Sequence, residues 1–144
     1  MERREFMKSA GGTAAALCCG VGVMSFLEGC SPVLRLDGLK TEQGISVGTS
    51  SFAEHQFAVI SHSELNAPIY LTKVEENKFR AFVMTCTHKQ CEVRATGTFM
   101  TCPCHGSEFS NQGEVLNGPA EEPLPEYKTS LTAESVVIDT SKIV

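Results

Sequence analysis

Cys86-Thr87-His88-Lys89-Gln90-Cys91 is the segment that decides the fold of this 144-residue chain, and Cys102-Pro103-Cys104-His105-Gly106-Ser107 completes it. Cysteine and histidine alternate in both segments, and thirteen residues separate His88 from Cys102. Thiolates and imidazoles are common ligands of transition metals. Four cysteines within 19 residues, interleaved with two histidines, therefore indicate a metal site.

Short β-strands and turns surround the two segments. We expect strands at residues 56–61, 68–74, 78–85, 98–101, 114–116, 127–131 and 135–139. No segment after residue 40 has a sustained helical period. The sequence thus predicts an all-β domain over residues 51–144. Residues 31–50, with Pro32, Gly38, Gly44 and Gly48, are expected to form a linker that leads into it.

The two segments resemble the ligand boxes of the Rieske iron–sulfur proteins, in the branch found in cytochrome bc-type complexes and related exported electron carriers. Gly118-Pro119-Ala120 is similar to the proline loop of that branch. The resemblance implies an antiparallel Rieske-type β-sandwich that binds one [2Fe-2S] cluster. A small cluster-binding subdomain is expected over about residues 84–120.

The same resemblance implies a ligand set. The thiolates of Cys86 and Cys102 would hold one iron, and the imidazoles of His88 and His105 the other. Cys91 and Cys104 are expected to pair as a disulfide between the two segments, which suits an oxidising compartment. Imidazoles in place of thiolates raise the reduction potential from about −400 mV to roughly −150 to +300 mV.

Five further residues are expected near the cluster. Ser107 matches the serine whose hydroxyl donates to a cluster sulfide, and Gly106 permits a tight turn. Phe109 stands where high-potential members carry a tyrosine, so we expect a potential in the middle or upper-middle of the range. Lys89 and Gln90 replace the Leu-Gly pair of quinol-oxidising members, which argues against direct quinol oxidation. Lys89 also adds a positive charge that could steer an acidic partner. Pro119 belongs to the proline loop.

Zinc is the alternative metal for these four ligands. Zinc fingers usually carry paired cysteines and paired histidines, whereas the two residue types alternate here. His55 and His62 lie outside both segments and are expected to be surface residues, and Glu75-Glu76 and Glu121-Glu122 to be solvated turn charges. The spacing favours the iron–sulfur cluster.

The N-terminus resembles an address for export. Met1-Glu2-Arg3-Arg4-Glu5-Phe6-Met7-Lys8 is similar to a twin-arginine signal. An uncharged stretch of eighteen residues, Ala10 to Leu27, approaches the length of a membrane-spanning helix. Leu27-Glu28-Gly29-Cys30 resembles a lipobox with an atypical glutamate. Residues 1–30 are expected to be an uncleaved anchor, a cleaved signal or a lipoprotein signal with Cys30 as the modified residue.

Together these features predict electron transfer on the periplasmic side of a bacterial inner membrane. The net charge of −5 argues against nucleic acid, which needs a basic surface. The chain carries no complete active site of its own, so we expect a carrier, or an iron–sulfur subunit of a quinol–cytochrome c reductase-like complex. Its expected partners are the membrane, through the N-terminal segment, cytochromes of the b or c type, and quinol as a candidate donor.

Two other classes remain open. The alternative is the small Rieske subunit of a periplasmic molybdenum oxidase of the arsenite-oxidase kind. Lys89-Gln90 and Phe109 favour it, whereas Cys86-Thr87-His88 and Gly118-Pro119-Ala120 favour the bc-complex branch. The ferredoxin of a ring-hydroxylating dioxygenase ranks last, because such proteins are cytosolic and lack the second pair of cysteines.

Overall fold

The computed structural model describes residues 33–144. The expected export signal, the stretch from Ala10 to Leu27 and the lipidation candidate Cys30 lie outside the described residues. Ser31–Val144 forms one compact unit. Among residues 33–144, no helix combines the length and the apolar character needed to cross a bilayer.

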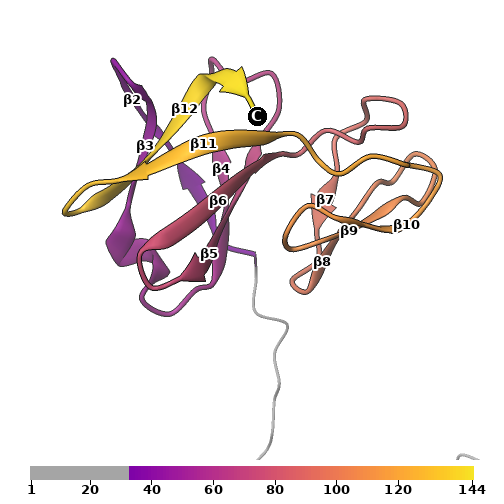
Figure 1. The fold of residues 1–144 in the computed structure, drawn as a ribbon, viewed down its shortest axis with the longest axis horizontal. Helices are drawn as coiled ribbons and strands as arrows, with labels where there is room; N and C mark the ends of the chain where they lie inside the picture. Colours follow the sequence, from indigo (N-terminus) through magenta and orange to yellow (C-terminus); the bar gives the residue numbers. More distant parts are fainter. Residues whose placement is uncertain (1–32) are drawn as a thin grey trace, which may run out of the picture. The chain divides into compact units, whose positions relative to one another are not determined.

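The described part is all-β, as predicted, and its larger sheet has eight strands (Figure 1). These are β1 (Arg35–Asp37), β2 (Leu39–Thr41), β3 (Gly44–Gly48), β4 (Phe57–Ser61), β5 (Ile69–Glu75), β6 (Lys78–Val83), β11 (Glu126–Leu131) and β12 (Ser135–Ile143). Their order is β1-β4-β5-β6-β11-β12-β3-β2, and every pairing is antiparallel except that of β1 with β4. A short 3-10 helix, η1 (Thr49–Phe52), follows β3.

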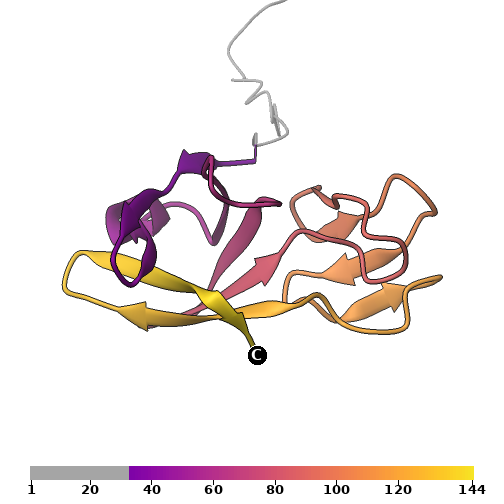
Figure 2. The same cartoon turned by 90° about the horizontal axis from the view of Figure 1, so that it is seen from above.

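A smaller sheet of four strands lies beside the larger one (Figures 1 and 2). It contains β7 (Arg94–Ala95), β8 (Phe99–Thr101), β9 (Glu108–Ser110) and β10 (Val115–Asn117), in the order β10-β9-β8-β7. The chain leaves the larger sheet at β6, builds the smaller sheet, and returns in β11, which pairs with β6. The smaller sheet is therefore an insertion between two neighbouring strands.

The central strands of the larger sheet bury side chains on both faces. Because alternate residues of a strand point to opposite faces, Ala58 and Ile60 pack in one core and Val59 between them packs in another. The second core contains Val59, Tyr70, Phe82, Met84, Cys86, Val93, Met100, Cys102, Phe109, Ala120 and Leu124. This core holds the smaller sheet against the larger one, and two cysteines of the expected ligand set belong to it.

The two edge strands of the larger sheet are consecutive in the chain. Only Gly38 separates β1 from β2, so the sheet curls until its two edges meet. A side chain at Gly38 would collide with Ile45 on β3 and would approach Ile60 on β4 to 3.1 Å. The strands β1, β2 and β3 thus lie within residues 31–50, the range expected to be a linker. The glycines of this range form a corner and a turn between short strands instead of a flexible connection.

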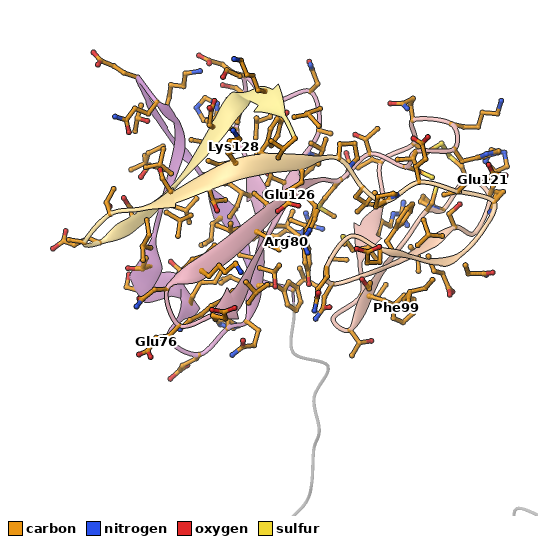
Figure 3. All side chains as sticks on the ribbon, viewed as in Figure 1. Glu76, Arg80, Phe99, Glu121, Glu126 and Lys128 are labelled. Atoms are coloured by element: carbon orange, nitrogen blue, oxygen red, sulfur yellow. A yellow bond between two sulfur atoms is a disulfide. The ribbon has the colours of Figure 1, made fainter. Side chains whose placement is uncertain are left out.

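The junction between the two sheets is held partly by side chains of β6. Arg80 donates two hydrogen bonds to Glu126, from Nε at 2.9 Å and from Nη2 at 2.6 Å (Figure 3), and this bonding raises the pKa of Arg80. The guanidinium lies 4.7 Å from the centre of the Phe82 ring. A Cβ at Gly113, between β9 and β10, would lie 2.7 Å from the same ring. A glycine is therefore required where the smaller sheet meets Phe82.

Candidate metal centre

The first cysteine loop, Cys86–Cys91, lies between β6 and β7 and is closed by its own backbone. The N–H of Cys86 donates to the carbonyl of Cys91 at 2.8 Å, and the N–H of Gln90 donates to the carbonyl of Cys86 at 2.9 Å. Gln90 has a φ of 61°, a left-handed conformation that costs a non-glycine residue about 1–2 kcal/mol. Backbone hydrogen bonds within the loop therefore help to maintain its shape.

The second cysteine loop, Cys102–Ser107, lies between β8 and β9 and repeats this pattern. Cys102 donates its N–H to the carbonyl of Ser107 at 2.8 Å, and Gly106 donates to the carbonyl of Cys102 at 3.0 Å. Gly106 occupies the position that corresponds to Gln90 and has a φ of 79°. Each loop thus begins with a buried cysteine and has a left-handed residue at its fifth position.

Cys86 and Cys102 are the free cysteines of residues 33–144, and they are only 1% and 2% exposed. Burial raises the pKa of the Cys86 thiol, but hydrogen bonds outweigh this effect and lower the pKa overall. These bonds come from the backbone amides of His88 and Lys89 and from the side chains of Cys102 and Ser107. Since the thiolate is the form that binds metals, these donors favour a ligand at Cys86.

His88 and His105 bring their rings together from the two loops. The ring centroids lie 5.1 Å apart, and the ring planes meet at 85°. His105 is exposed and His88 is half-buried, in contrast to the two buried sulfurs. The structure therefore brings the four expected ligands into one region, with sulfur toward the core and nitrogen toward the surface.

The structure joins Cys91 and Cys104 by a disulfide that links the two cysteine loops, with a Cα–Cα distance of 6.5 Å. The sulfur atoms of Cys91, Cys102 and Cys104 all lie within 4.8 Å of one another. Because two of these sulfurs are bonded to each other, Cys102 alone among the three offers a thiolate. The cross-link thus lies directly beside Cys102, one of the two buried cysteines expected to be ligands.

The segment Gly118–Glu122, called here the proline segment, is hydrogen-bonded to both cysteine loops. The backbone N–H of Ala120 donates to Oγ of Ser107 at 3.0 Å. Ser107 is fully buried, and its side chain is among the groups that lower the pKa of the Cys86 thiol. Oγ1 of Thr87 donates to the carbonyl of Glu122 at 2.8 Å. The proline segment, with its cis bond before Pro119, is thereby fixed relative to both buried sulfurs.

The remaining expected residues occupy different environments. Phe109 is fully buried in the second core, whereas Lys89 and Pro119 are exposed. Thr87 and Ala120 also contact the site; the sequence placed them within the first cysteine segment and the proline loop but did not predict their hydrogen bonds. Thr87 and its partner are 35 residues apart, so no local pattern could have signalled this contact.

The comparison with protein families identifies the domain. The model described as "Rieske [2Fe-2S] domain" matches residues 45–128, from β3 to β11. The chain belongs to the Rieske [2Fe-2S] family. A Rieske protein carries electrons through an iron–sulfur cluster, so the predicted cofactor and the predicted class of protein are confirmed.

Relatives of this Rieske protein include iron–sulfur subunits of cytochrome b6-f complexes. The "Cytochrome b6-f complex iron-sulfur subunit" of Chlorobaculum tepidum is 25% identical over 144 residues, covering 95% of this chain and 75% of that protein. A "Putative Rieske 2Fe-2S iron-sulfur protein YhfW" of Bacillus subtilis is 55% identical over 42 residues, which is 28% of this chain and 8% of that one. The plasma membrane Rieske protein PetC3 of Synechocystis PCC 6803 superimposes with a TM-score of 0.54 at 28% identity, covering 65% of this chain and 96% of that one.

The donor set of this Rieske domain fits a [2Fe-2S] cluster. One side of the site offers two buried sulfurs, one of which is surrounded by hydrogen-bond donors that stabilise negative charge. The other side offers two imidazoles from different loops. Two anionic and two neutral ligands, held on separate sides, match the Cys₂His₂ ligation that defines a Rieske centre.

Proposed function

We propose that Cys86 and Cys102 hold one iron of the cluster and that His88 and His105 hold the other. The protein then transfers single electrons on the periplasmic side of a bacterial membrane. It acts as the iron–sulfur subunit of a complex related to quinol–cytochrome c reductases, or as a separate carrier. The observation that carries this proposal is the approach of the two imidazoles to 5.1 Å from separate loops that also bury one cysteine each.

The exposed imidazole edge is the proposed exit for the electron. When bound, the cluster supplies one electron at a potential within about −150 to +300 mV. His105 is exposed and His88 is half-buried, so a partner can approach both rings without opening the core. The ligand imidazoles can also release protons, so electron uptake and proton uptake are expected to be coupled.

The relatives support a role in a membrane complex. The match to the Chlorobaculum tepidum protein covers 95% of this chain, and that protein is named as a cytochrome b6-f complex subunit. The twin-arginine-like residues and the apolar stretch before residue 30 supply an export route and a membrane attachment in this proposal. Lys89, in place of the leucine usual in quinol-oxidising members, favours transfer between proteins over direct quinol oxidation.

A redox titration of the full-length protein, followed by EPR from pH 6 to pH 10, tests the proposal. We expect iron and acid-labile sulfide in equal amounts, and a midpoint potential that falls as the pH rises. His105→Ala should abolish the cluster signal. His55→Ala, a substitution at an exposed histidine outside both loops, should leave the signal unchanged.

Three results would contradict the proposal. A colourless protein that contains zinc would remove the cluster. A midpoint potential that does not fall at high pH would exclude imidazole ligation. A midpoint below about −100 mV at neutral pH would exclude the bc-type assignment in favour of a ferredoxin-like carrier.

A further inference from the structure

A depression in the surface lies directly beside the half-buried imidazole of His88. Its volume is about 550 Å³, and it is lined by Thr87, His88, Pro119, Glu121 and Glu122. One wall is therefore a proposed cluster ligand, and the opposite wall is part of the proline segment. A protein that receives an electron through His88 must cover this depression.

Two carboxylates without salt-bridge partners line this depression. Glu121 and Glu122 are exposed, and neither takes part in a salt bridge within residues 33–144. Three of the fourteen acidic side chains of residues 33–144 do form salt bridges: Glu64 with Lys40, Glu75 with Lys78, and Glu126 with Arg80. Figure 3 shows Glu121 at the far end of the smaller sheet, with Glu76 at the other end of the molecule's described part. Unpaired negative charge is thus present at the site of electron exit.

The backbone that carries the two carboxylates is held at a fixed position relative to His88. Thr87, the residue before His88, donates its hydroxyl to the carbonyl of Glu122 at 2.8 Å. The backbone N–H of Ala120, next to Glu121, is bonded to the buried hydroxyl of Ser107 at 3.0 Å. Because the backbone of the proline segment is ordered before any partner arrives, less conformational entropy is lost on docking.

We propose that Glu121 and Glu122 select the redox partner, and that this partner presents lysine or arginine side chains around the exposed edge of its own redox centre. The inference rests on the proposed function, because it assumes that the electron leaves through the imidazoles. The partner's cations enter the depression beside His88 and pair with the two carboxylates. One electron then passes from the reduced cluster to the oxidised centre of the partner, and no bond forms or breaks between the two proteins.

Lys89 is the competing charge on this surface. It is exposed and follows His88 directly, so it attracts an acidic partner. Two arguments favour the cationic partner. The depression has two carboxylates and no lysine in its lining. Residues 33–144 carry nine lysines and arginines against fourteen aspartates and glutamates, so the long-range field also attracts cations.

Stopped-flow mixing of the reduced, cluster-loaded, full-length protein with two ferric c-type cytochromes, one basic and one acidic, tests the inference. With the basic cytochrome, Glu121→Gln/Glu122→Gln should lower the second-order rate constant about three- to ten-fold at low ionic strength. This difference should disappear near 1 M salt, where the screening length is about 3 Å. Lys89→Gln should leave this rate constant unchanged or raise it.

Glu75→Gln/Glu76→Gln is the matched control, because it removes the same charge from exposed residues at the end of β5 and in the turn that follows it. The inference is overturned if both double variants slow the reaction equally, or if the acidic cytochrome reacts faster than the basic one and Lys89→Gln abolishes that preference. Cluster content and midpoint potential are measured on every variant beforehand. A failure of the proposed function is seen there, as a missing cluster, and a failure of this inference only in the rate constants.

Discussion

The backbone N–H of Ala120 donates a 3.0 Å hydrogen bond to the hydroxyl oxygen of Ser107, and both residues are buried. The same side chain is among the groups that lower the pKa of the Cys86 thiol. Ser107 therefore connects the proline segment to a proposed ligand of the cluster. The hydrogen bond from Ala120 polarises the Ser107 hydroxyl, so the position of the proline segment affects how well this hydroxyl stabilises negative charge on the sulfur.

Ser107→Ala should lower both the midpoint potential and the stability. A donor to the sulfur stabilises the reduced, more negative cluster, and its loss should shift the potential down by on the order of 50 mV, since 59 mV corresponds to a tenfold change for one electron. The N–H of Ala120 would lose its partner, which costs about 1–3 kcal/mol. Redox titration and urea unfolding measure the two effects. Ser110→Ala, which removes an exposed hydroxyl on β9, should leave the potential unchanged.

Phe109→Tyr should raise the midpoint potential. Phe109 is fully buried in the core that also contains Cys86 and Cys102, and a hydroxyl there would gain a sulfur as its acceptor. The expected increase is on the order of 50 mV, which corresponds to about 1 kcal/mol of hydrogen-bond energy. A loss of stability with no change in potential would show that the ring edge does not face a ligand sulfur.

Gly113→Ala should destabilise the protein more than Gly106→Ala. Both glycines have a φ of 79°, so the backbone strain is the same. A methyl group at Gly106 meets nothing within 4 Å, whereas one at Gly113 would lie 2.7 Å from the Phe82 ring. We expect a loss of about 1 kcal/mol for Gly106→Ala, and a further 1–3 kcal/mol, roughly, for Gly113→Ala. Equal losses in chemical denaturation would show that the ring of Phe82 moves aside freely.

Removal of the disulfide should weaken the metal centre. Cys91 and Cys104 are 13 residues apart, and closing a loop of that size stabilises a protein by about 3 kcal/mol in the chain-entropy model. Cys91→Ala/Cys104→Ala should therefore lose the cluster at a lower denaturant concentration than the wild type. The visible absorbance of the cluster reports this loss. Mass mapping without reduction should recover one cross-linked peptide pair from the wild-type protein.

Tyr70 should make the protein less stable at high pH. Burial raises the pKa of Tyr70 to about 12, whereas in the unfolded chain the phenol ionises near its ordinary value of about 10. Between about pH 10 and 12 the Tyr70 phenol therefore stays protonated in the folded state, whereas it ionises in the unfolded chain. This ionisation favours the unfolded chain, so the free energy of unfolding is at its full value below pH 10 and falls between about pH 10 and 12. The loss amounts to about 2–3 kcal/mol. Tyr70→Phe should show a correspondingly smaller decline in urea unfolding over this range, and an identical decline would contradict the assignment.

Strands with a strong local signal were the part of the fold that sequence reasoning predicted well. The strands expected at 56–61, 78–85 and 127–131 correspond to β4, β6 and β11 within a few residues. These segments have apolar or β-branched residues between turns, which is a local property. The turn residues Gly38 and Gly44 misled the interpretation, because a glycine in a linker and a glycine at a sheet corner look the same in sequence.

By itself, the sequence determined which atoms could bind the metal and how they are spaced along the chain. Cysteine and histidine at fixed separations in two turns are enough to name a Rieske centre, since ligand chemistry depends on residue type and short-range geometry. The tertiary structure decided which partners these turns find. It placed Ala120 on Ser107, Thr87 on Glu122, and alternate residues of β4 in two different cores. Such contacts join residues that are far apart in the chain, and they arise only when the whole sheet closes and buries its apolar faces together.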